Sequence, residues 1–250
     1  MSQSDIMLPD TMLAVDDLHC GYQRGIDILQ GLSLSVRTGS LTLIIGPNGA
    51  GKSTLLRAIF GFLTPHTGSI AFRGQRIDGQ QPYRIKLHGI GYVPQEINTF
   101  PQLTIEENLR MGGWTLRRDR ALLAERLAKI YAIFPVLAER RRKRAGELSG
   151  GQGRMLSVAR EMMTEPALML VDEPTAGLAP NLVDQVYELL ATARRTTGTT
   201  ILLVDQNIED SIRHADTVYM VNVGRIKAAG PAAEFDAARI RQLIQECLLG

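Results

Sequence analysis

A glycine-rich segment near the start of the chain constrains its fold more than any other part of the sequence. The apolar run LTLII at 41–45 leads directly into GPNGAGKST at 46–54, and apolar residues at helical spacing follow at 53–63. The segment matches the pattern G-x-x-x-x-G-K-[ST], with its fixed positions at Gly46, Gly51, Lys52 and Ser53. A strand that ends in such a loop and continues as a helix is typical of phosphate-binding sites. We therefore predict a nucleoside-phosphate site in an α/β core.

The residue types in this loop suit that chemistry. Glycines let the backbone approach phosphates with its N–H groups pointing inward, and the N-terminus of the following helix adds a partial positive charge. Lys52 is placed to contact the β- and γ-phosphates, and Ser53 to offer its hydroxyl to Mg²⁺. The residues expected to bind the nucleotide are Gly46, Pro47, Asn48, Gly49, Ala50, Gly51, Lys52, Ser53 and Thr54. A glycine-rich turn that merely precedes a helix is the alternative interpretation.

Two adjacent carboxylates end a second apolar strand, in ALMLVDEP at 167–174. Phosphoryl transfer needs a carboxylate that holds Mg²⁺ and a base that orients water, so we assign Asp172 to the metal and Glu173 to the water. Side chains alternate along a strand, which predicts that Glu173, as the next residue of the strand, points away from Asp172. Taken alone, such a pair is as often a solvated turn, and the phosphate loop favours the catalytic interpretation.

Strand-like segments dominate residues 12–45, which predicts a sheet-rich start. In the second of these segments the residues on one face are Leu32, Leu34 and Val36. Later, the buried strands ALMLV and TTILLV alternate with helices, one opened by Ser149 and one running from Pro180 to near Gly198. This alternation predicts a parallel sheet. A hairpin around Asn222–Gly224 and a final helix of about 15 residues complete the pattern.

The middle of the chain has a helical pattern. Thr104 and Glu107 form a T-x-x-E capping box. The helical stripe that follows consists of Leu123, Leu127, Ile130 and Phe134. We interpret the basic run RRRKR at 140–144 as a solvated helix end rather than a surface for nucleic acid or anionic lipid. Trp114 is expected to pack in the core of this insert, with contact to a membrane partner as the alternative.

Charge and composition exclude several other classes of protein. The 28 basic and 26 acidic residues leave a formal charge of +2, so we predict no nucleic-acid partner. Cys20 and Cys247 stand alone, and the four histidines have no metal-site spacing, which argues against a disulfide framework or a metal site built from cysteine or histidine ligands. The first ten residues lack the features of an export signal, and no apolar stretch is long enough to span a bilayer. We therefore expect a cytoplasmic chain that reaches a membrane only through another subunit.

The segment LSGGQ, at 148–152, distinguishes this chain from other proteins with a phosphate loop, because it resembles the signature motif of ABC ATPases. Gln95 in YVPQ is similar to the Q-loop glutamine, Tyr22 to the aromatic residue that stacks on adenine, and EPTAGLAP to the D-loop region. The resemblance covers nearly the whole chain. It implies a single ABC ATPase domain over 1–250. The fold class that it implies is an α/β P-loop NTPase (RecA-like) core with an N-terminal antiparallel β subdomain. An α-helical subdomain is then inserted in this core at roughly 96–160.

The same resemblance implies ATP hydrolysis with Mg²⁺ in a head-to-tail dimer. ATP is then expected between one subunit's phosphate loop and the signature residues of the other, which are Ser149, Gly150, Gly151 and Gln152. Because Ser149 and its glycines open a helix, they present a hydroxyl, N–H groups and a dipole end to the γ-phosphate, and an ordinary helix cap is the alternative. Gln95 is implied to lie at Mg²⁺ and the attacking water, and Gln206 to sense the γ-phosphate. The alternative for Gln206 is an exposed loop residue without a role in the site, and the alternative for Tyr22 is a residue that merely packs against its neighbours.

Four phrases are similar to the ATPases of branched-chain or hydrophobic amino acid importers: NTFPQLTIEENLRMG, ERRRKRAGELSGGQ, EPTAGLAP and ILLVDQN. They imply a peripheral protein at the cytoplasmic face of the cell membrane. Its partners are then integral membrane permease subunits, a second ABC ATPase subunit in a homo- or heterodimer and, indirectly, a periplasmic or extracellular binding protein. Ala179 and Gln206 depart from the wider family, which has an aspartate and a histidine there. Urea or short-amide importers, soluble ABC ATPases and slow nucleotide-dependent regulators remain alternatives.

Overall fold

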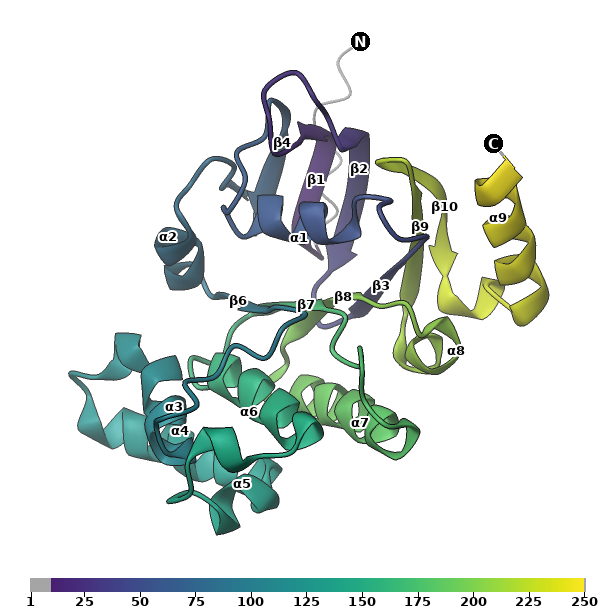
Figure 1. The fold of residues 1–250 in the computed structure, drawn as a ribbon. Helices are drawn as coiled ribbons and strands as arrows, with labels where there is room; N and C mark the ends of the chain where they lie inside the picture. The colour runs from purple at the N-terminus through teal and green to yellow at the C-terminus, as the bar shows by residue number, and fades with distance from the viewer. Residues whose placement is uncertain (1–9, 250) are drawn as a thin grey trace. The chain divides into compact units, whose positions relative to one another are not determined.

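The computed structural model describes residues 10–249, except for the side chains at 181 and 247–249. The predictions about an export signal in the first nine residues and about Cys247 therefore lie outside the described part. Two compact units are present, the first formed by the described residues up to His88 and from Thr200 on, and the second by Gly89–Thr199 (Figure 1).

An antiparallel sheet of four strands occurs in the first unit, in the order β2-β1-β4-β5 (Figure 1). The strands are β1 (Thr11–Cys20), β2 (Leu29–Arg37), β4 (Thr67–Phe72) and β5 (Gln75–Arg76). Along β2 the residues Leu32, Leu34 and Val36 are buried and the serines between them are exposed, which confirms the predicted face. Cys20 is buried at the end of β1, and burial raises the pKa of its thiol to about 11, so the thiol stays protonated at neutral pH.

A group of parallel strands in the first unit positions the glycine-rich loop. Strand β3 (Leu41–Ile45) pairs in parallel with both β8 (Thr200–Val204) and β9 (Thr217–Asn222). Every residue of β3 and β8 is buried, as expected for strands inside a parallel sheet. Strand β10 (Arg225–Pro231) returns antiparallel to β9. The predicted hairpin is confirmed, since Val223 and Gly224 have φ angles of 45° and 72°, as a tight two-residue turn requires.

Within its described residues, the first unit contains three helices of eight residues or fewer and one of 13 residues. They are α1 (Lys52–Ile59), α2 (Pro82–Leu87), α8 (Ile208–Ser211) and α9 (Ala237–Leu249), with 3₁₀ turns at Ile212–His214 and Ala232–Glu234. The predicted helix after the glycine-rich loop extends to residue 63, but α1 ends at Ile59. Gly61 has a left-handed φ of 82°, and a Cβ there would lie 2.2 Å from the carbonyl oxygen of Gln80. The chain therefore turns at Gly61, because only glycine adopts this conformation so close to another backbone segment.

The second unit is mainly helical around one parallel pair of strands, β6 (Ile90–Val93) and β7 (Leu168–Asp172) (Figure 1). Its helices are α3 (Ile105–Gly112), α4 (Arg120–Ile133), α5 (Pro135–Glu139), α6 (Gly150–Met162) and α7 (Pro180–Thr197), with 3₁₀ turns at Trp114–Leu116 and Ala145–Glu147. The capping box of Thr104 and Glu107 is confirmed at the start of α3. Helix α7 begins at Pro180 and ends before Gly198, whose φ is 68°, as predicted.

The helical stripe predicted for this unit is confirmed, because its four members are all buried: Leu123, Leu127, Ile130 and Phe134. The prediction that Trp114 packs in the core is wrong. Its side chain is 56% exposed, and the guanidinium of Arg117 lies 4.8 Å from the centre of its ring. Helix α3 has already ended at Gly112, and the following 3₁₀ turn leaves the indole outside.

The basic run at 140–144 follows α5, and its members from Arg141 on to Arg144 are exposed. Its backbone nevertheless has a structural task. The carbonyl oxygens of Lys143 and Arg141 accept hydrogen bonds from the N–H groups of Ile105 and Glu106, each over 3.0 Å. The run thus satisfies two of the four N–H groups that the first turn of α3 leaves without intrahelical partners.

Candidate nucleotide site

The glycine-rich loop connects β3 to α1 and owes its shape to glycines. Gly46, Gly49 and Gly51 have φ angles of 149°, 78° and 106°. A Cβ at Gly46 would lie 2.1 Å from the carbonyl oxygen of Val221. Among the described residues, no side chain caps the N-terminus of α1. The loop and the helix start therefore offer backbone N–H groups, which suits phosphate oxygens.

Gly46→Ala is expected to lower the free energy of unfolding by about 2 kcal/mol or more, because the new methyl group meets the Val221 carbonyl in a backbone conformation that is already unfavourable. Gly49→Ala is the matched control, since Gly49 also has a positive φ but faces open space. Its expected cost is about 1 kcal/mol. Urea unfolding of both variants measures the difference, and equal costs would contradict the role given to the Val221 contact.

Lys52 is the first residue of α1, directly after the loop, and only 5% of its surface is exposed. Its Nζ donates hydrogen bonds to the carbonyl oxygens of Gly46 over 2.8 Å and of Pro47 over 3.0 Å. A buried ammonium group held by the carbonyls of its own loop is a fixed positive charge. This cation and the N–H groups around it fit a polyphosphate.

Gln206 lies at the same sheet edge as the loop. Ile44 of β3 pairs with Val204 of β8. Gly46 comes two residues after Ile44, and Gln206 comes two residues after Val204. Its predicted position after the carboxyl end of a strand is therefore confirmed, and its side chain is exposed there. Parallel sheets place their ligand sites at this edge.

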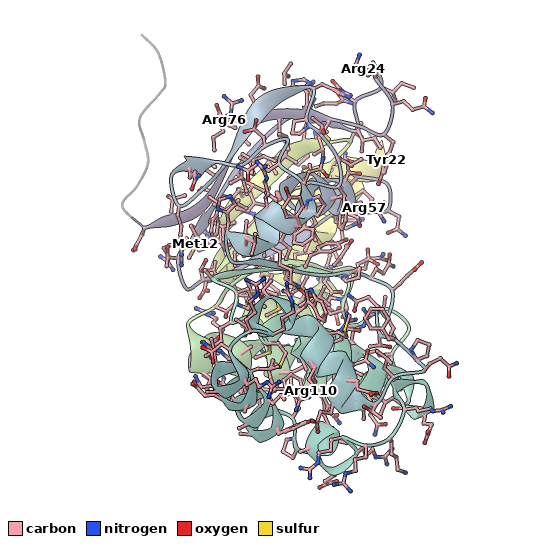
Figure 2. All side chains as sticks on the ribbon, turned by 90° about the vertical axis from the view of Figure 1, so that its left-hand side faces the viewer. Met12, Tyr22, Arg24, Arg57, Arg76 and Arg110 are labelled. Atoms are coloured by element: carbon pink, nitrogen blue, oxygen red, sulfur yellow. The ribbon has the colours of Figure 1, made fainter. Side chains whose placement is uncertain are left out.

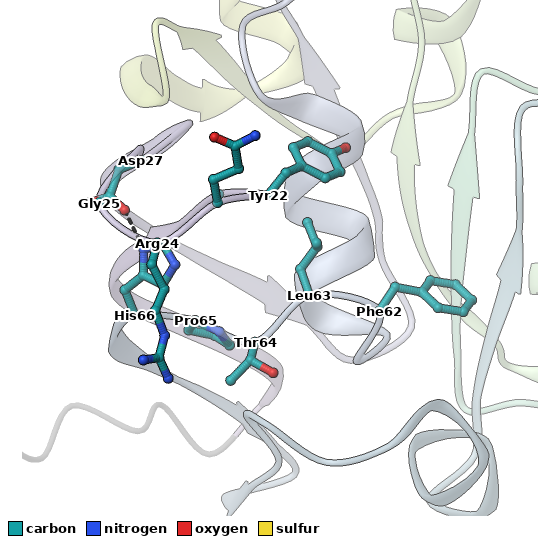
Figure 3. Close-up of a pocket in the computed structure, with 11 residues that line it drawn as sticks. Tyr22, Arg24, Gly25, Asp27, Phe62, Leu63, Thr64, Pro65 and His66 are labelled. Carbon is teal, nitrogen blue, oxygen red and sulfur yellow. Dashed lines mark hydrogen bonds and ion pairs between the residues drawn. The ribbon is translucent and has the colours of Figure 1, made fainter.

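Tyr22 belongs to the same unit and is held near α1. Its ring is 54% exposed, and its hydroxyl accepts a hydrogen bond from Nη1 of Arg57, on α1, over 2.9 Å (Figure 2). The ring borders a pocket of about 780 Å³, which is within the usual range for small-molecule sites (Figure 3). The structure thus presents Tyr22 as an accessible ring rather than as a packed core residue.

Two histidines stabilise the loop that follows Tyr22. Asp27 accepts hydrogen bonds from Nδ1 of His66 over 2.6 Å and from Nδ1 of His19 over 3.0 Å. These bonds hold the pKa of Asp27 below its ordinary value, and the bond from His66 has the largest effect. Asp27 and His66 also line the pocket (Figure 3). The two histidines therefore have a structural task in joining separate parts of the loop region.

In the second unit, the structure brings Gln95 to the carboxylate pair. Nε2 of Gln95 donates a hydrogen bond to Oε2 of Glu173 over 2.7 Å, and the hydroxyl of Tyr92 donates to Oδ2 of Asp172 over 3.4 Å. Asp172 is 2% exposed and Glu173 6%. Both carboxylates thus lie in sheltered positions with polar partners.

The prediction that Glu173 continues the strand is wrong. Strand β7 ends at Asp172, and Glu173 has a left-handed φ of 44°. Its carbonyl oxygen accepts a hydrogen bond from the N–H of Ala176 over 3.2 Å, so a turn begins at this residue. Non-glycine residues with such a φ are uncommon and concentrate at functional sites.

The signature residues open helix α6. Ser149 is its N-cap in a capping box with Gln152, whose side chain also accepts a hydrogen bond from Arg140 over 3.4 Å. Ser149 and Gly150 are exposed, whereas a Cβ at Gly151 would lie 2.7 Å from a methyl group of Leu182. The capping oxygen of Ser149 acts as an acceptor, and its hydroxyl proton is available to a further acceptor.

Sequence reasoning did not single out Arg154 and Arg160, two buried arginines on α6. Both donate hydrogen bonds to the segment around Gln95. The available signal was their place in RMLSVAREMM at 154–163, a mostly apolar stretch of a helix with Glu161 as its one other charged residue, where a buried charge needs a specific partner.

Comparison with known proteins identifies the family. The ABC transporter family model matches residues 29–176, more than half of the chain. The chain is 39% identical to the high-affinity branched-chain amino acid transport ATP-binding protein BraG of Pseudomonas aeruginosa, over 86% of this chain and 91% of that protein. It is 35% identical to the probable branched-chain amino acid transport ATP-binding protein LivF of Archaeoglobus fulgidus, over 89% and 93%.

Solved structures agree with this assignment. The crystal structure of an ATP-binding cassette of an ABC transporter in its ADP conformation matches with a TM-score of 0.85 and 29% identity, over 96% of this chain and 99% of that one. A nucleotide-free ATP-binding cassette matches with a TM-score of 0.82 and 28% identity, over the same shares. The predicted P-loop NTPase fold class is thereby confirmed. The chain belongs to the ABC transporter family and is one of its ATP-binding cassettes.

Proposed function

We propose that this chain hydrolyses ATP to drive an importer of branched-chain amino acids. Membership in the family makes it a nucleotide-binding ATPase coupled to transport. The observation that carries the substrate class is the similarity, over most of both chains, to BraG and LivF, which are named for branched-chain amino acid transport. The buried carboxylate pair and the hydrogen bond from Gln95 to Glu173 support an active ATPase.

The proposed ATP contacts follow from the loop described above. The phosphates bind the N–H groups of residues 46–54 and the ammonium group of Lys52, and adenine stacks on the exposed ring of Tyr22. Ser53, Gln95 and Asp172 are proposed to hold Mg²⁺, since a hydroxyl, an amide oxygen and a carboxylate are the hard oxygen ligands that this ion prefers. When bound, Mg²⁺ offsets the negative charge of the phosphate oxygens.

Glu173 is proposed as the group that orients the attacking water and accepts its proton. The hydrogen bond from Nε2 of Gln95 fixes the position of one carboxylate oxygen of Glu173. Gln206 is proposed to donate a hydrogen bond from its amide to the γ-phosphate, as a histidine could, but without a titration near neutral pH. Each of these residues thus acts through a hydrogen bond that its side-chain chemistry allows.

A second ATPase subunit is proposed to complete the site. Ser149 and Gly150 are exposed at the start of α6, where they can present a hydroxyl and N–H groups to a γ-phosphate bound by a neighbouring subunit. Gln152 supports them through the capping box, and Gly151 allows close packing on Leu182. The partner is either a second copy of this chain or a related subunit.

Permease subunits are the proposed membrane partners, and they are expected to hold this chain at the cytoplasmic face of the membrane. No helix in residues 10–249 has the length and hydropathy needed to cross a bilayer. Among the described side chains of the second unit, the large apolar ones that are exposed are those of Ile97, Phe100, Met111 and Trp114. Aromatic residues and methionine are enriched in protein interfaces, so this surface is the proposed docking site for a permease helix. An extracytoplasmic binding protein is proposed to deliver the amino acid to that permease.

ATP-dependent uptake of labelled leucine into proteoliposomes that contain the assembled transporter tests this function. Trp114→Ala is expected to reduce uptake at least about tenfold, because a truncated interface aromatic costs on the order of 2 kcal/mol. Tyr83→Ala is the control, since Tyr83 is 61% exposed in the first unit and lies outside the proposed docking surface. Uptake of urea instead of leucine would overturn the substrate class, and the absence of ATP-dependent uptake by the assembled transporter would overturn the transport function.

A further inference from the structure

Helix α6 buries two positive charges. Arg154 is 3% exposed and Arg160 is 9% exposed. Burial lowers the pKa of both guanidinium groups, and the charges of Asp172 and Glu161 oppose this effect at Arg154 and Arg160 respectively. Burying a charged group costs free energy unless hydrogen bonds replace its water. The partners of these two arginines therefore show which contact the helix is built to make.

Both arginines donate to the backbone of one short segment, residues 94–100, here called the Gln95 loop. Nη1 of Arg154 donates to the carbonyl oxygen of Pro94 over 2.8 Å, and Nη2 donates to that of Gln95. Nη1 of Arg160 donates to the carbonyl oxygen of Asn98. The guanidinium of Arg160 also lies 4.9 Å from the centre of the Phe100 ring. Two side chains thus hold the loop along most of its length.

Close backbone packing makes the connection stiff. A Cβ at Gly153 of α6 would lie 3.2 Å from Cδ1 of Ile97, in the Gln95 loop. A Cβ at Gly112 of α3 would lie 2.3 Å from the carbonyl oxygen of Arg160. Glycine at both positions lets the loop and α3 touch α6 directly. Such close contacts leave the loop little room to move without the helix.

We propose that Arg154 and Arg160 are positioning residues that join the Gln95 loop to helix α6. The loop carries Gln95 at one end and the exposed side chains of Ile97 and Phe100 at the other, and the helix begins at Ser149. Pressure on the exposed end of the loop then moves both Gln95 and the signature end of the helix. The proposal deepens the proposed function, and it rests on it for the identity of the partner that applies the pressure.

Arginine is suited to this task, and lysine only in part. A planar guanidinium can reach two carbonyl oxygens in fixed directions, as Arg154 does, whereas a lysine ammonium is a point charge on a flexible stem. Replacement by glutamine removes the charge and shortens the side chain. Buried carbonyl oxygens then lose charged donors. Each variant therefore loses more stabilising free energy than the loss of an ordinary hydrogen bond would remove.

The test compares Arg154→Gln and Arg160→Gln with their lysine counterparts and with Arg126→Gln. Arg126 is the matched control, because its side chain is 17% exposed in the same unit but pairs with Glu165 instead of the Gln95 loop. Hydrogen exchange of the peptide that covers 94–100 is measured on the full-length chain. The kcat and KM for ATP are measured in the assembled transporter.

Arg154→Gln and Arg160→Gln are each expected to speed exchange in the Gln95 loop by about tenfold, the equivalent of a lost charge-assisted hydrogen bond. The kcat should fall by a similar factor while the KM for ATP stays unchanged, and lysine should recover part of both effects. Exchange no faster than in Arg126→Gln, or faster exchange with unchanged kcat, would overturn the proposal. If the wild-type transporter hydrolysed no ATP, the proposed function would fail, and the exchange measurement would still decide whether the two arginines hold the loop.

Discussion

Glu173→Gln is expected to slow ATP hydrolysis by roughly 10² or more while ATP binding persists. A glutamine amide retains the shape of the side chain but cannot accept a proton from water. It also places a second amide against Nε2 of Gln95, which now donates to the carboxylate over 2.7 Å. Phosphate release gives the rate, and calorimetry gives the ATP affinity. ATP-bound dimers should accumulate, because the step that consumes ATP is blocked.

Glu161→Gln is the matched control for this experiment. Glu161 is as buried as Glu173, at 6% exposed, and Oε2 of its side chain accepts a hydrogen bond from the N–H of Tyr92 over 3.4 Å. Its replacement tests the general effect of removing a sheltered carboxylate from the same unit. Near-normal turnover of Glu173→Gln, with no build-up of dimers on size exclusion, would mean that another group activates the water.

Lys52→Ala is expected to weaken ATP binding by about 10² or more, since each hydrogen bond to a charged group contributes on the order of 1.5–3 kcal/mol. The side chain is a cation with 5% exposure, and alanine leaves the phosphate oxygens without this charged donor. Calorimetric titration with MgATP is the measurement. Lys227→Ala removes an exposed lysine from β10 and should leave the affinity unchanged. An unchanged affinity in Lys52→Ala would remove the loop from the ATP site.

Local patterns in the sequence predicted the elements that depend on local physics. The capping box at Thr104, the helix opened by Ser149 and the helix that runs from Pro180 to near Gly198 depend on residues a few positions apart. The parallel strands around the glycine-rich loop were predictable because strands buried on both faces are continuously apolar. The proposed roles of these residues, and the bounds of 96–160 for the helical subdomain, stay predictions.

Features that depend on distant contacts could not be predicted in the same way. Strand alternation gave no sign that the chain leaves β7 after Asp172, since the left-handed φ of Glu173 belongs to the turn that follows. The exposure of Trp114 follows from the end of α3 at Gly112, two residues earlier. The burial of Arg154 depends on carbonyl groups about 60 residues away, at Pro94 and Gln95, which no local pattern records.

Trp114 is the single tryptophan of the chain, and it is one of the exposed apolar residues of the second unit. The intrinsic fluorescence of this protein therefore comes, above the tyrosine background, from one indole at the proposed docking surface. An exposed indole emits at longer wavelength than one covered by a partner, and the nearby guanidinium of Arg117 is part of its electrostatic environment. The chain thus carries its own optical probe, and binding of a partner at this surface can be followed without a label or an engineered residue.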